Sequence, residues 1–452
     1  MRWDDSSVRA ALGLPAASSV PDTGFSAVST DSRALPQGSL FVALRGDRFD
    51  AHDFLPAARE AGASGAVVRR GTAAVDGLAY YEVDDPNLAL GDLARARRRA
   101  IPGPVIAVTG SNGKTSTREM LAAALRTRYR THATRKNLNN LVGVPLTILE
   151  APEGTEAMVV EAGASLPGEM ARHRVVIEPS LTVITNVAAG HLEGFGSRDG
   201  VLREKLALAE GVPFAVVGTE PSALAEQARR RARKVVTAGL AGADRVPTSV
   251  ELTADGRPRV TVAGQTFLLD ARGRHQAANA MVAWAAAEAL GLEPARVARS
   301  LEALELPGGR SELTQLGGFT ILNDAYNANP ASFRAAIELS RVLRGDRRLV
   351  FVAGTMLELG EAAAALHREI ATQLVGLRPD LLAAVGDFAA ALEPHRAALG
   401  DRLLTAPDAL TMGPLLAERL TGGELVVLKG SRGVALERIL PDLAARPSSP
   451  TA

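Results

Sequence analysis

The sequence predicts a multidomain α/β protein, and three observations support this prediction. At 452 residues the chain exceeds the length at which one hydrophobic core stops growing, so two or three domains are expected. From residue 105 onward, apolar strand-like runs alternate with helical stretches, which indicates parallel sheets joined by crossover helices. The composition, with 46% hydrophobic and 22% charged residues, is typical of a soluble globular chain.

Composition and charge exclude several classes of function. The net charge of +1 gives no support to binding of nucleic acid or of a membrane surface. The absence of Cys excludes disulfides and thiol catalysis, and it fits a reducing compartment. No stretch has 18 uninterrupted apolar residues, and the start MRWDDSSVRAALGL lacks the apolar core of a signal peptide. We therefore expect a cytoplasmic protein without a membrane span.

The chain divides into three expected domains at residues 1–100, 101–307 and 308–452. The first contains the strand-like runs SLFVAL, GAVVRR and YYEV, and it ends in the basic helical run LARARRRA. The prolines of IPGP, residues 101–104, then break the helix.

The second and third expected domains both have the strand–helix rhythm. The second contains VIAVTG, AMVVEAG, LTVITNV and FAVVG, and its residues 246–270 predict a small antiparallel insertion because polar turns separate their alternating segments. ELPGGR, residues 305–310, precedes the third domain, which contains FTILNDAY, RLVFVAG, LLAAVG and ELVVLKG.

A strand, a glycine turn and a helix follow one another in VIAVTGSNGKTSTREML, which predicts a phosphate-binding loop. Gly110 and Gly113 let backbone N–H groups approach phosphate oxygens, and the helix directs its positive end at them. Lys114 would reach the terminal phosphates, and the Thr115 hydroxyl would complete a Mg²⁺ shell. The spacing departs from the common pattern, because Val108 stands where a glycine is usual. The predicted nucleotide-binding residues are Gly110, Ser111, Asn112, Gly113, Lys114, Thr115 and Ser116.

Two further polar residues follow strands of the same expected domain. Glu161 ends AMVVE and His191 follows LTVITNVAAG, and ligands of open α/β sheets gather at such carboxyl ends. A carboxylate and a neutral imidazole can hold divalent metals beside phosphates. The alternatives are a solvated loop acid and a packed or capping histidine.

These motifs together resemble the Mur ligase superfamily, which also contains the folylpolyglutamate synthases. The resemblance lies in TGSNGKTS, EAGA at residues 161–164 and HLEGFGS at residues 191–197. It implies a small α/β UDP-sugar-binding domain, a central P-loop-type domain with a mostly parallel sheet, and a C-terminal Rossmann-like α/β domain. It also implies that ATP activates a carboxylate as an acyl phosphate, which an amine then attacks. Two Mg²⁺ sites are implied, with Thr115, Glu161, His191 and Lys205 as metal-binding residues and Lys114, His191 and Lys205 as catalytic ones.

Lys205 is a lysine in a chain that strongly prefers arginine. Of 51 basic residues only five are lysines, and the family has a lysine fourteen residues after the histidine of HLEGFGS. The resemblance implies that Lys205 carries a carbamate derived from CO₂, which helps to bind the second metal. This chemistry needs a neutral amine, whereas a guanidinium stays protonated. The alternative is a surface lysine paired with Glu204 or Glu210, which would contribute little stability.

Three later stretches extend the nucleotide site that the resemblance implies. Asn279, on a helix expected to be amphipathic, matches the residue at the adenine end of ATP. Arg310 in LPGGRSE matches an arginine at the phosphates, and Asp324 in NDAYNANPAS matches the acid that binds the ribose. The alternatives are a helix-face amide, a linker cation and an Asx turn before Pro330.

The first block, with STDSRALPQGSLFVALRGDRFD, resembles the UDP-sugar-binding domain of the third and fourth amino-acid-adding Mur ligases. Hydroxyls and a forked guanidinium suit a pyrophosphate and a ribose. The residues expected at the UDP-linked substrate are Thr30, Ser32, Arg33, Asp47, Arg48, Asn137, Asn139 and Asn140.

KNLNNLVGVPLTIL, NDAYNANPAS and LVVLKGSRGVALE resemble the branch that joins D-alanyl-D-alanine to a UDP-N-acetylmuramoyl-tripeptide. In that reading Asn327, Lys429, Ser431 and Arg432 hold the dipeptide, and the protein acts as a monomer in peptidoglycan synthesis. Three alternatives stay open: a diaminopimelate- or lysine-adding Mur ligase, a P-loop kinase or nucleotide switch, and a non-catalytic UDP-sugar-binding module. The DNPR sequence typical of the diaminopimelate-adding enzyme is missing.

Overall fold

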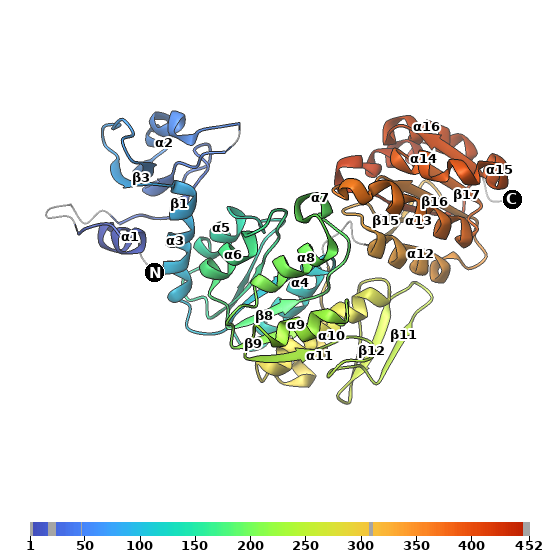
Figure 1. The fold of residues 1–452 in the computed structure, drawn as a ribbon, viewed down its shortest axis with the longest axis horizontal. Helices are drawn as coiled ribbons and strands as arrows, with labels where there is room; N and C mark the ends of the chain where they lie inside the picture. The colour runs from blue at the N-terminus through green and yellow to red at the C-terminus, as the bar shows by residue number, and fades with distance from the viewer. Residues whose placement is uncertain (1–2, 17–23, 47, 307–310, 446–452) are drawn as a thin grey trace.

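The computed structural model describes residues 3–16, 24–46, 48–306 and 311–445. These residues form three α/β units in chain order, from the N-terminal unit in blue to the C-terminal unit in red (Figure 1). This is the three-domain α/β architecture that the sequence predicts. The expected boundary between the second and third domains falls at residues 307–310, outside the described residues.

The N-terminal unit is built on a four-stranded parallel sheet with the order β1-β2-β3-β4. Its strands are β1 (Val28–Ser29), β2 (Ser39–Val42), β3 (Ala63–Arg69) and β4 (Ala79–Val83), and its helices include α1 (Asp5–Leu12), α2 (Leu55–Glu60) and α3 (Pro86–Arg99). The three predicted strand-like runs correspond to β2, β3 and β4. Trp3 is buried in a core with Phe25 and Tyr81.

Helix α3 connects the N-terminal unit to the central one (Figure 1). It is the predicted basic run, and it ends before the prolines of IPGP as expected. Glu178, just after α6 (Glu169–Ile177), accepts hydrogen bonds at 2.6 Å from both Arg95 and Arg99. Arg98 donates to the carbonyl oxygens of Ile177 and Glu178. The hydrogen bond from Arg99, supported by Arg95, lowers the pKa of Glu178 to about 2. The arginines of α3 therefore join two units.

The central unit contains a six-stranded parallel sheet with the order β10-β9-β8-β5-β7-β6. Its strands are β5 (Val105–Thr109), β6 (Thr131–Ala133), β7 (Ala157–Glu161), β8 (Leu181–Ile184), β9 (Phe214–Val217) and β10 (Lys234–Thr237). Its helices include α4 (Lys114–Arg126), α5 (Gly143–Leu149), α6, α7 (Leu192–Phe195), α8 (Arg198–Ala207), α9 (Ala223–Arg229) and α11 (Pro294–Glu302). Alternate residues of β5 enter two different hydrophobic cores, so both faces of the sheet are covered by apolar side chains.

The predicted antiparallel insertion is present in the central unit. It consists of β11 (Ser249–Leu252), β12 (Pro258–Val262) and β13 (Gln265–Leu268). Phe267 of this sheet stacks on Trp284 of α10 (Arg274–Ala289) with ring centroids 5.9 Å apart. Because α4 also packs on α10, this helix is buried on most of its surface. The expectation of an amphipathic helix around Asn279 is therefore wrong.

The C-terminal unit contains a six-stranded sheet with the order β14-β15-β19-β16-β17-β18. Only β14 is antiparallel to its neighbour. The strands are β14 (Glu312–Leu316), β15 (Phe319–Asp324), β16 (Leu349–Gly354), β17 (Leu381–Val385), β18 (Leu403–Ala406) and β19 (Leu425–Lys429). The helices include α12 (Pro330–Arg344), α13 (Ala363–Leu377), α14 (Asp387–Leu392), α15 (Arg396–Leu399), α16 (Ala409–Arg419) and α17 (Leu440–Ala444).

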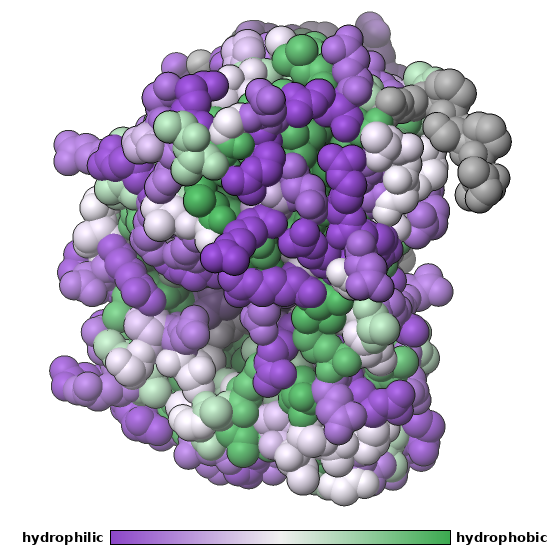
Figure 2. All heavy atoms as spheres, turned by 90° about the vertical axis from the view of Figure 1, so that its right-hand side faces the viewer, coloured by the Kyte–Doolittle hydropathy of each residue, from purple (hydrophilic) through white to green (hydrophobic). Residues whose placement is uncertain are grey.

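The surface agrees with the polar composition of the chain. On the face in Figure 2, hydrophilic residues dominate and hydrophobic ones lie scattered between them. Within the described ranges, no helix has the length and apolar character needed to cross a membrane.

Candidate active site

A cavity of about 1030 Å³ lies between the central and C-terminal units. Its lining combines the phosphate loop and the ends of central strands with β15, β19 and α12 of the C-terminal unit. The predicted residues that line it are Ser111, Asn112, Gly113, Lys114, Thr115, Ser116, Asn137, Asn139, Asn140, Glu161, His191, Lys205, Asn279, Asp324, Asn327, Lys429, Ser431 and Arg432. Sequence positions more than 300 residues apart thus meet at one place.

The phosphate loop joins β5 to α4 at the edge of this cavity. Gly110 and Gly113 both have positive φ angles, of 151° and 79°. A Cβ atom at Gly110 would lie 1.9 Å from Oγ1 of Thr185, and one at Gly113 would lie 2.1 Å from Oδ1 of Asn279. Glycine is therefore required at both positions, because the loop is packed tightly against β8 and α10.

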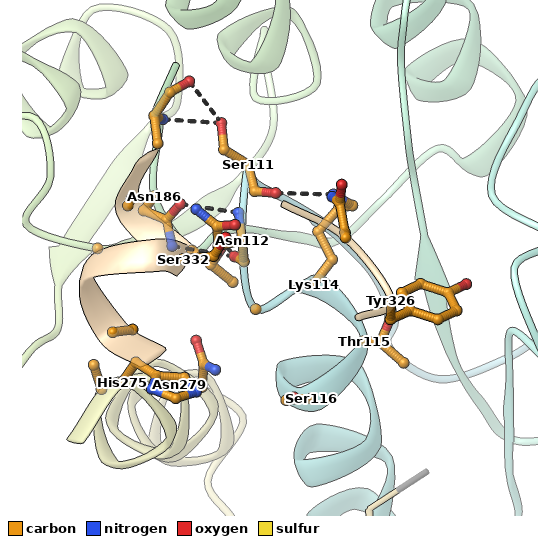
Figure 3. A pocket seen from close by; sticks show the side chains of 18 of the residues that line it. Ser111, Asn112, Lys114, Thr115, Ser116, Asn186, His275, Asn279, Tyr326 and Ser332 are labelled. Atoms are coloured by element: carbon orange, nitrogen blue, oxygen red, sulfur yellow. Dashed lines mark hydrogen bonds between the residues drawn. The ribbon is translucent and has the colours of Figure 1, made fainter. Parts of the chain in front are cut away.

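Asn186, which sequence reasoning missed, fixes the loop from the side (Figure 3). Its carbonyl oxygen accepts from the Ser111 N–H at 2.9 Å, and its Oδ1 accepts from the Asn112 N–H at 3.0 Å. Its Nδ2 donates to the Asn112 carbonyl oxygen at 3.1 Å. Lys114 Nζ donates to the carbonyl oxygen of Gly110 at 2.9 Å. The loop is thus rigid, with α4 beginning at Lys114 behind it.

Glu161, at the end of β7, belongs to a buried polar network. Arg118 of α4 donates from Nη1 to one carboxylate oxygen at 3.0 Å, and Asn139 Nδ2 donates to the other at 2.9 Å. Arg118 is 1% exposed, and its remaining partners include Glu119 and the carbonyl oxygen of Lys136. The alternative of a solvated loop acid is wrong, because Glu161 is buried. Arg118 was not predicted, since a basic residue on a buried helix face has no distinctive local pattern.

Lys205 of α8 is 1% exposed and lines the cavity. Burial, followed by the positive charge of Lys114, lowers the pKa of Lys205 to about 7. Both acids considered as surface partners are engaged elsewhere: Glu204 accepts from the N–H groups of Gly168 and Met170, and Glu210 pairs with an arginine. The alternative of a surface lysine is therefore wrong.

His191 stands at the contact between the two units. Its φ is 55°, and its Nδ1 lies 2.5 Å from Oε2 of Glu358, in the loop after β16. The Glu193 N–H donates to the Glu358 carbonyl oxygen at 3.2 Å. His367 of α13 holds the same loop, because its Nε2 accepts from the Met356 N–H at 2.9 Å. Glu358 was not predicted as a site residue.

The buried Lys429 and the half-buried Asp324 form an ion pair at the ends of β19 and β15. Lys429 Nζ lies 3.0 Å from Asp324 Oδ2, and it donates to the carbonyl oxygens of Asp324 and Asn327 at 3.0 and 2.5 Å. Asp324 Oδ1 accepts from the Ser311 N–H at 3.0 Å. Lys429 is 1% exposed, so its three protons are directed at its own unit rather than at a ligand.

The other residues expected at the dipeptide differ in exposure. Ser431 is buried, and its Oγ accepts from the Leu357 N–H at 2.9 Å. Arg432 keeps 69% of its side chain exposed and pairs with Glu437 at 3.1 Å. Asn327 Oδ1 accepts from the next backbone N–H.

Asn137, Asn139 and Asn140 of the central unit also line the cavity. Asn140 Oδ1 accepts from the N–H groups of Val142 and Gly143, so it caps the turn into α5. Asn139 joins Glu161, as described above, and the Asn137 carbonyl oxygen accepts from the Asn139 N–H at 2.8 Å.

The residues predicted at the uridine end do not line this cavity. Thr30 and Ser32 are half-buried in the N-terminal unit, and Arg48 is exposed. Arg33 is 86% exposed and forms two hydrogen bonds with Asp31, which lower the pKa of Asp31 to about 2. Asp47 and Arg310 lie outside the described residues.

A phosphate loop at a cavity between two units is the arrangement of a nucleotide-dependent α/β enzyme. The family profile "Mur ligase family, catalytic domain" matches residues 25–98, "Mur ligase middle domain" matches 108–287, and "Mur ligase, glutamate ligase domain" matches 309–432. The UDP-N-acetylmuramoyl-tripeptide–D-alanyl-D-alanine ligase of Bacillus subtilis is 36% identical over 93% of this chain and 94% of its own length. The chain belongs to the Mur ligase family, in the branch of the UDP-N-acetylmuramoyl-tripeptide–D-alanyl-D-alanine ligases.

Solved structures lead to the same assignment. A MurF structure from Acinetobacter baumannii has a TM-score of 0.88 and 30% identity, and the match covers 99% of both chains. The MurF ligase from Thermotoga maritima in complex with ADP has a TM-score of 0.80 and 28% identity, over 92% of this chain and 97% of that one.

Proposed function

We propose that this protein uses ATP to join D-alanyl-D-alanine to UDP-N-acetylmuramoyl-tripeptide in the cytoplasm. The product is the UDP-muramoyl-pentapeptide of peptidoglycan synthesis, and the reaction passes through an acyl phosphate. The observation that carries the proposal is the single cavity in which a phosphate loop, a buried lysine and a C-terminal arginine meet. The named relatives support the choice of substrates.

ATP binds with its phosphates at the loop of residues 110–116. Lys114 and the N-terminal end of α4 offset the charge of the γ-phosphoryl group. The adenine lies near Asn279 and the ribose near Asp324, with Arg310 as a further phosphate contact. The ADP in the Thermotoga relative supports a nucleotide at this cavity.

The side chains of the cavity can hold Mg²⁺ only if ligands other than Asp, Glu and His side chains take part. Among the residues that the structure describes, no group of three or more His, Cys, Asp or Glu is arranged to hold a metal. The Thr115 hydroxyl, Glu161, His191 and a carbamate on Lys205 would hold two ions together with the phosphates. When bound, Mg²⁺ neutralises charge on the phosphoryl oxygens.

Lys205 becomes a carbamate when its neutral amine attacks CO₂, forms an N–C bond and releases one proton. The amine is suited to this, because burial has already lowered its pKa to about 7. The product is an anion in place of a cation, which relieves the repulsion from Lys114.

The amide then forms in two transfers. The terminal carboxylate of the tripeptide attacks the γ-phosphorus of ATP, and the bond between this phosphorus and the β–γ bridging oxygen breaks. The products of this step are the acyl phosphate and ADP. The amine of D-alanyl-D-alanine attacks the carbonyl carbon and loses a proton, and phosphate leaves from the tetrahedral intermediate. The UDP-linked substrate lies along Asn137, Asn139 and Asn140 toward Thr30, Ser32, Arg33, Asp47 and Arg48.

The dipeptide carboxylate binds at Arg432 rather than at Lys429. Both were expected to receive it, but the ammonium group of Lys429 is used by Asp324 and Asn327. Arg432 lines the cavity, is largely exposed and offers a forked donor. Lys429 instead fixes the loop that carries Asn327.

The test is an assay of phosphate release with the purified full chain. We expect release to require ATP, the tripeptide nucleotide and the dipeptide together, and one amide to form per phosphate. Equal release with either substrate omitted, or a stable phosphorylated product without amide, would contradict the ligase proposal and favour a kinase or nucleotide switch.

A further inference from the structure

A pair of asparagine side chains joins the phosphate loop to the C-terminal unit. Asn329 Nδ2 donates to Asn112 Oδ1 at 2.8 Å, and Asn112 Nδ2 donates to Asn329 Oδ1 at 3.3 Å. The two residues are 217 positions apart in the sequence. Asn112 belongs to the loop, whereas Asn329 precedes α12.

Both ends of this pair are held rigidly by their own units. The Asn112 backbone is fixed by Asn186 and by Thr185, whose Oγ1 donates to the Asn112 carbonyl oxygen at 2.5 Å. Asn329 is the N-cap of α12, because its Oδ1 accepts from the Ser332 N–H at 3.0 Å. Figure 3 shows Ser332 alongside Asn112 and Asn186. The pair thus links the phosphate loop to the N-terminal end of α12.

The side chain of Asn329 has two separable tasks. Its oxygen caps α12, which serine or aspartate can also do. Its nitrogen donates to Asn112 of the loop, and the same oxygen also accepts from Asn112 Nδ2. A serine side chain is too short to make either contact with the loop. Asn329 is 3% exposed and Asn112 is half-buried, so loss of the Asn329 amide would leave the partly desolvated Asn112 side chain without these bonds.

We propose that Asn329 is a positioning residue that couples the phosphate loop to closure of the C-terminal unit. This inference rests on the proposed function and deepens it. The pair keeps the dipeptide-binding residues of the C-terminal unit over the loop while the acyl phosphate exists. Closure excludes water, which would otherwise attack the carbonyl carbon and release phosphate without an amide.

The contact between His191 and Glu358 also joins the central and C-terminal units. A small second cavity beside the pair is lined by residues of both units, among them Ser111, His191, Asn329 and Glu358. The asparagine pair differs from this contact because one of its members is part of the phosphate loop itself.

The experiment compares two substitutions in the capping box of α12. Asn329→Ser keeps the cap and loses the pair. Ser332→Ala keeps the pair and weakens the cap, because Ser332 Oγ accepts from the Asn329 N–H at 3.0 Å. For each variant we would measure phosphate released per amide formed, kcat, and KM for each substrate.

We expect Asn329→Ser to release several phosphates per amide and to lower kcat for amide formation about tenfold, the effect of losing one to two hydrogen bonds. KM for the tripeptide nucleotide should change less than about twofold. Ser332→Ala should keep one phosphate per amide. In an Asn112→Ala background, Asn329→Ser should add no further loss, because the pair is already broken.

The proposal is overturned if Asn329→Ser keeps one phosphate per amide with normal kcat. It is also overturned if both substitutions uncouple equally, which would mean that helix capping matters and the pair does not. Failure of the proposed function looks different, because the unaltered protein would then show no phosphate release dependent on both substrates.

Discussion

Lys205 illustrates how much chemistry a single buried residue adds to this site. Its amine lies near Lys114 in the cavity, whereas its neighbour Glu204 accepts from backbone N–H groups and Glu210 pairs with an arginine. An unmodified buried ammonium at this position would be costly, because burial disfavours the charged form. The carbamate that we propose would remove that cost and would supply a ligand for metal.

The first prediction concerns the pH dependence of this modification. With ¹³C-bicarbonate, the full chain should show a carbamate signal in its carbon NMR spectrum at pH 8. The folded pKa of Lys205 is about 7, well below its usual 10.5, so the reactive neutral amine is lost as the pH falls through 7. The signal should therefore decrease about tenfold per pH unit below 7. A signal that persists in Lys205→Arg, or that is equal at pH 6 and pH 8, would contradict the assignment.

The second prediction separates the two cations of the KGSR motif. Arg432→Ala should raise KM for the dipeptide more than tenfold and leave KM for ATP and the unfolding temperature nearly unchanged, because its side chain is exposed. Lys429→Ala should instead lower the free energy of unfolding by about 3 kcal/mol, since it leaves Asp324 without its buried partner. Steady-state kinetics and thermal unfolding of both variants would distinguish these roles, and a stable Lys429→Ala variant with only a dipeptide defect would reverse the assignment.

At the level of elements, α3 is the last helix of the N-terminal unit, and its arginines also bind the central unit. Its arginines converge on the end of α6, where the Glu178 backbone turns with a φ of 41°. The sequence predicts the helix and its end, but a basic run in isolation indicates only a solvated face. The partner lies 79 to 83 residues away, so only the tertiary structure reveals the seam.

The third prediction tests this seam. Glu178→Gln should lower the free energy of unfolding by about 1 kcal/mol at pH 7, the size expected for a partly exposed ion-pair network. The folded pKa of Glu178 is about 2 against a usual 4.5, so the stabilisation is present above pH 4.5 and is lost as the pH falls toward 2. Urea unfolding followed by the fluorescence of Trp3, in the N-terminal core, would measure it.

A matched control is Glu226→Gln, which removes an exposed pair with Arg230 on α9 and away from any seam. It should have almost no effect. If both substitutions behave alike at pH 7, the α3 seam adds no stability of its own.

Sequence reasoning succeeded where the signal is local. The strand, glycine turn and helix of the phosphate loop are contiguous, and the apolar runs of the inner strands are unbroken. It missed the edge strands β14 and β18, because they are short and partly polar and so resemble loops. It misjudged α10, because burial by the inserted sheet cannot be read from the helix itself.

The predicted site residues divide in the same way. Lys114 begins α4, and Glu161 and Asp324 end strands β7 and β15, so motif and position predict them. Asn186, Arg118 and Glu358 act through partners distant in the sequence, and no pattern around them indicates those partners. The capping position of Asn329 before Pro330 is a local signal, but it indicates a helix start and not a contact with the phosphate loop.

For the whole molecule, the main functional feature is a cavity shared by the second and third units. The first unit contributes none of the described residues that line it. The residues that we propose for recognition of the uridine end therefore lie apart from the residues that line the cavity.

The fourth prediction follows from this separation. A non-hydrolysable ATP analogue should slow hydrogen exchange at the phosphate loop and also at the start of α12, because both line one cavity. Residues 24–46 of the N-terminal unit should exchange at an unchanged rate. Mass spectrometry of peptic fragments would measure this, with Lys114→Ala as a control that removes both effects. Protection confined to the central unit would show that the two units do not bind the nucleotide together.

The arginine bias of the chain has a practical consequence at this cavity. Three of its five lysines, Lys114, Lys205 and Lys429, line the cavity. The remaining basic side chains are two lysines and 46 arginines, and the arginines present guanidinium groups. Reagents selective for uncharged amines therefore find few competing targets on the protein surface. When CO₂ is removed and the proposed carbamate is absent, Lys205 is largely uncharged at a pH where ordinary lysines are not, so an aldehyde or activated ester shaped for the nucleotide pocket would find a reactive amine there.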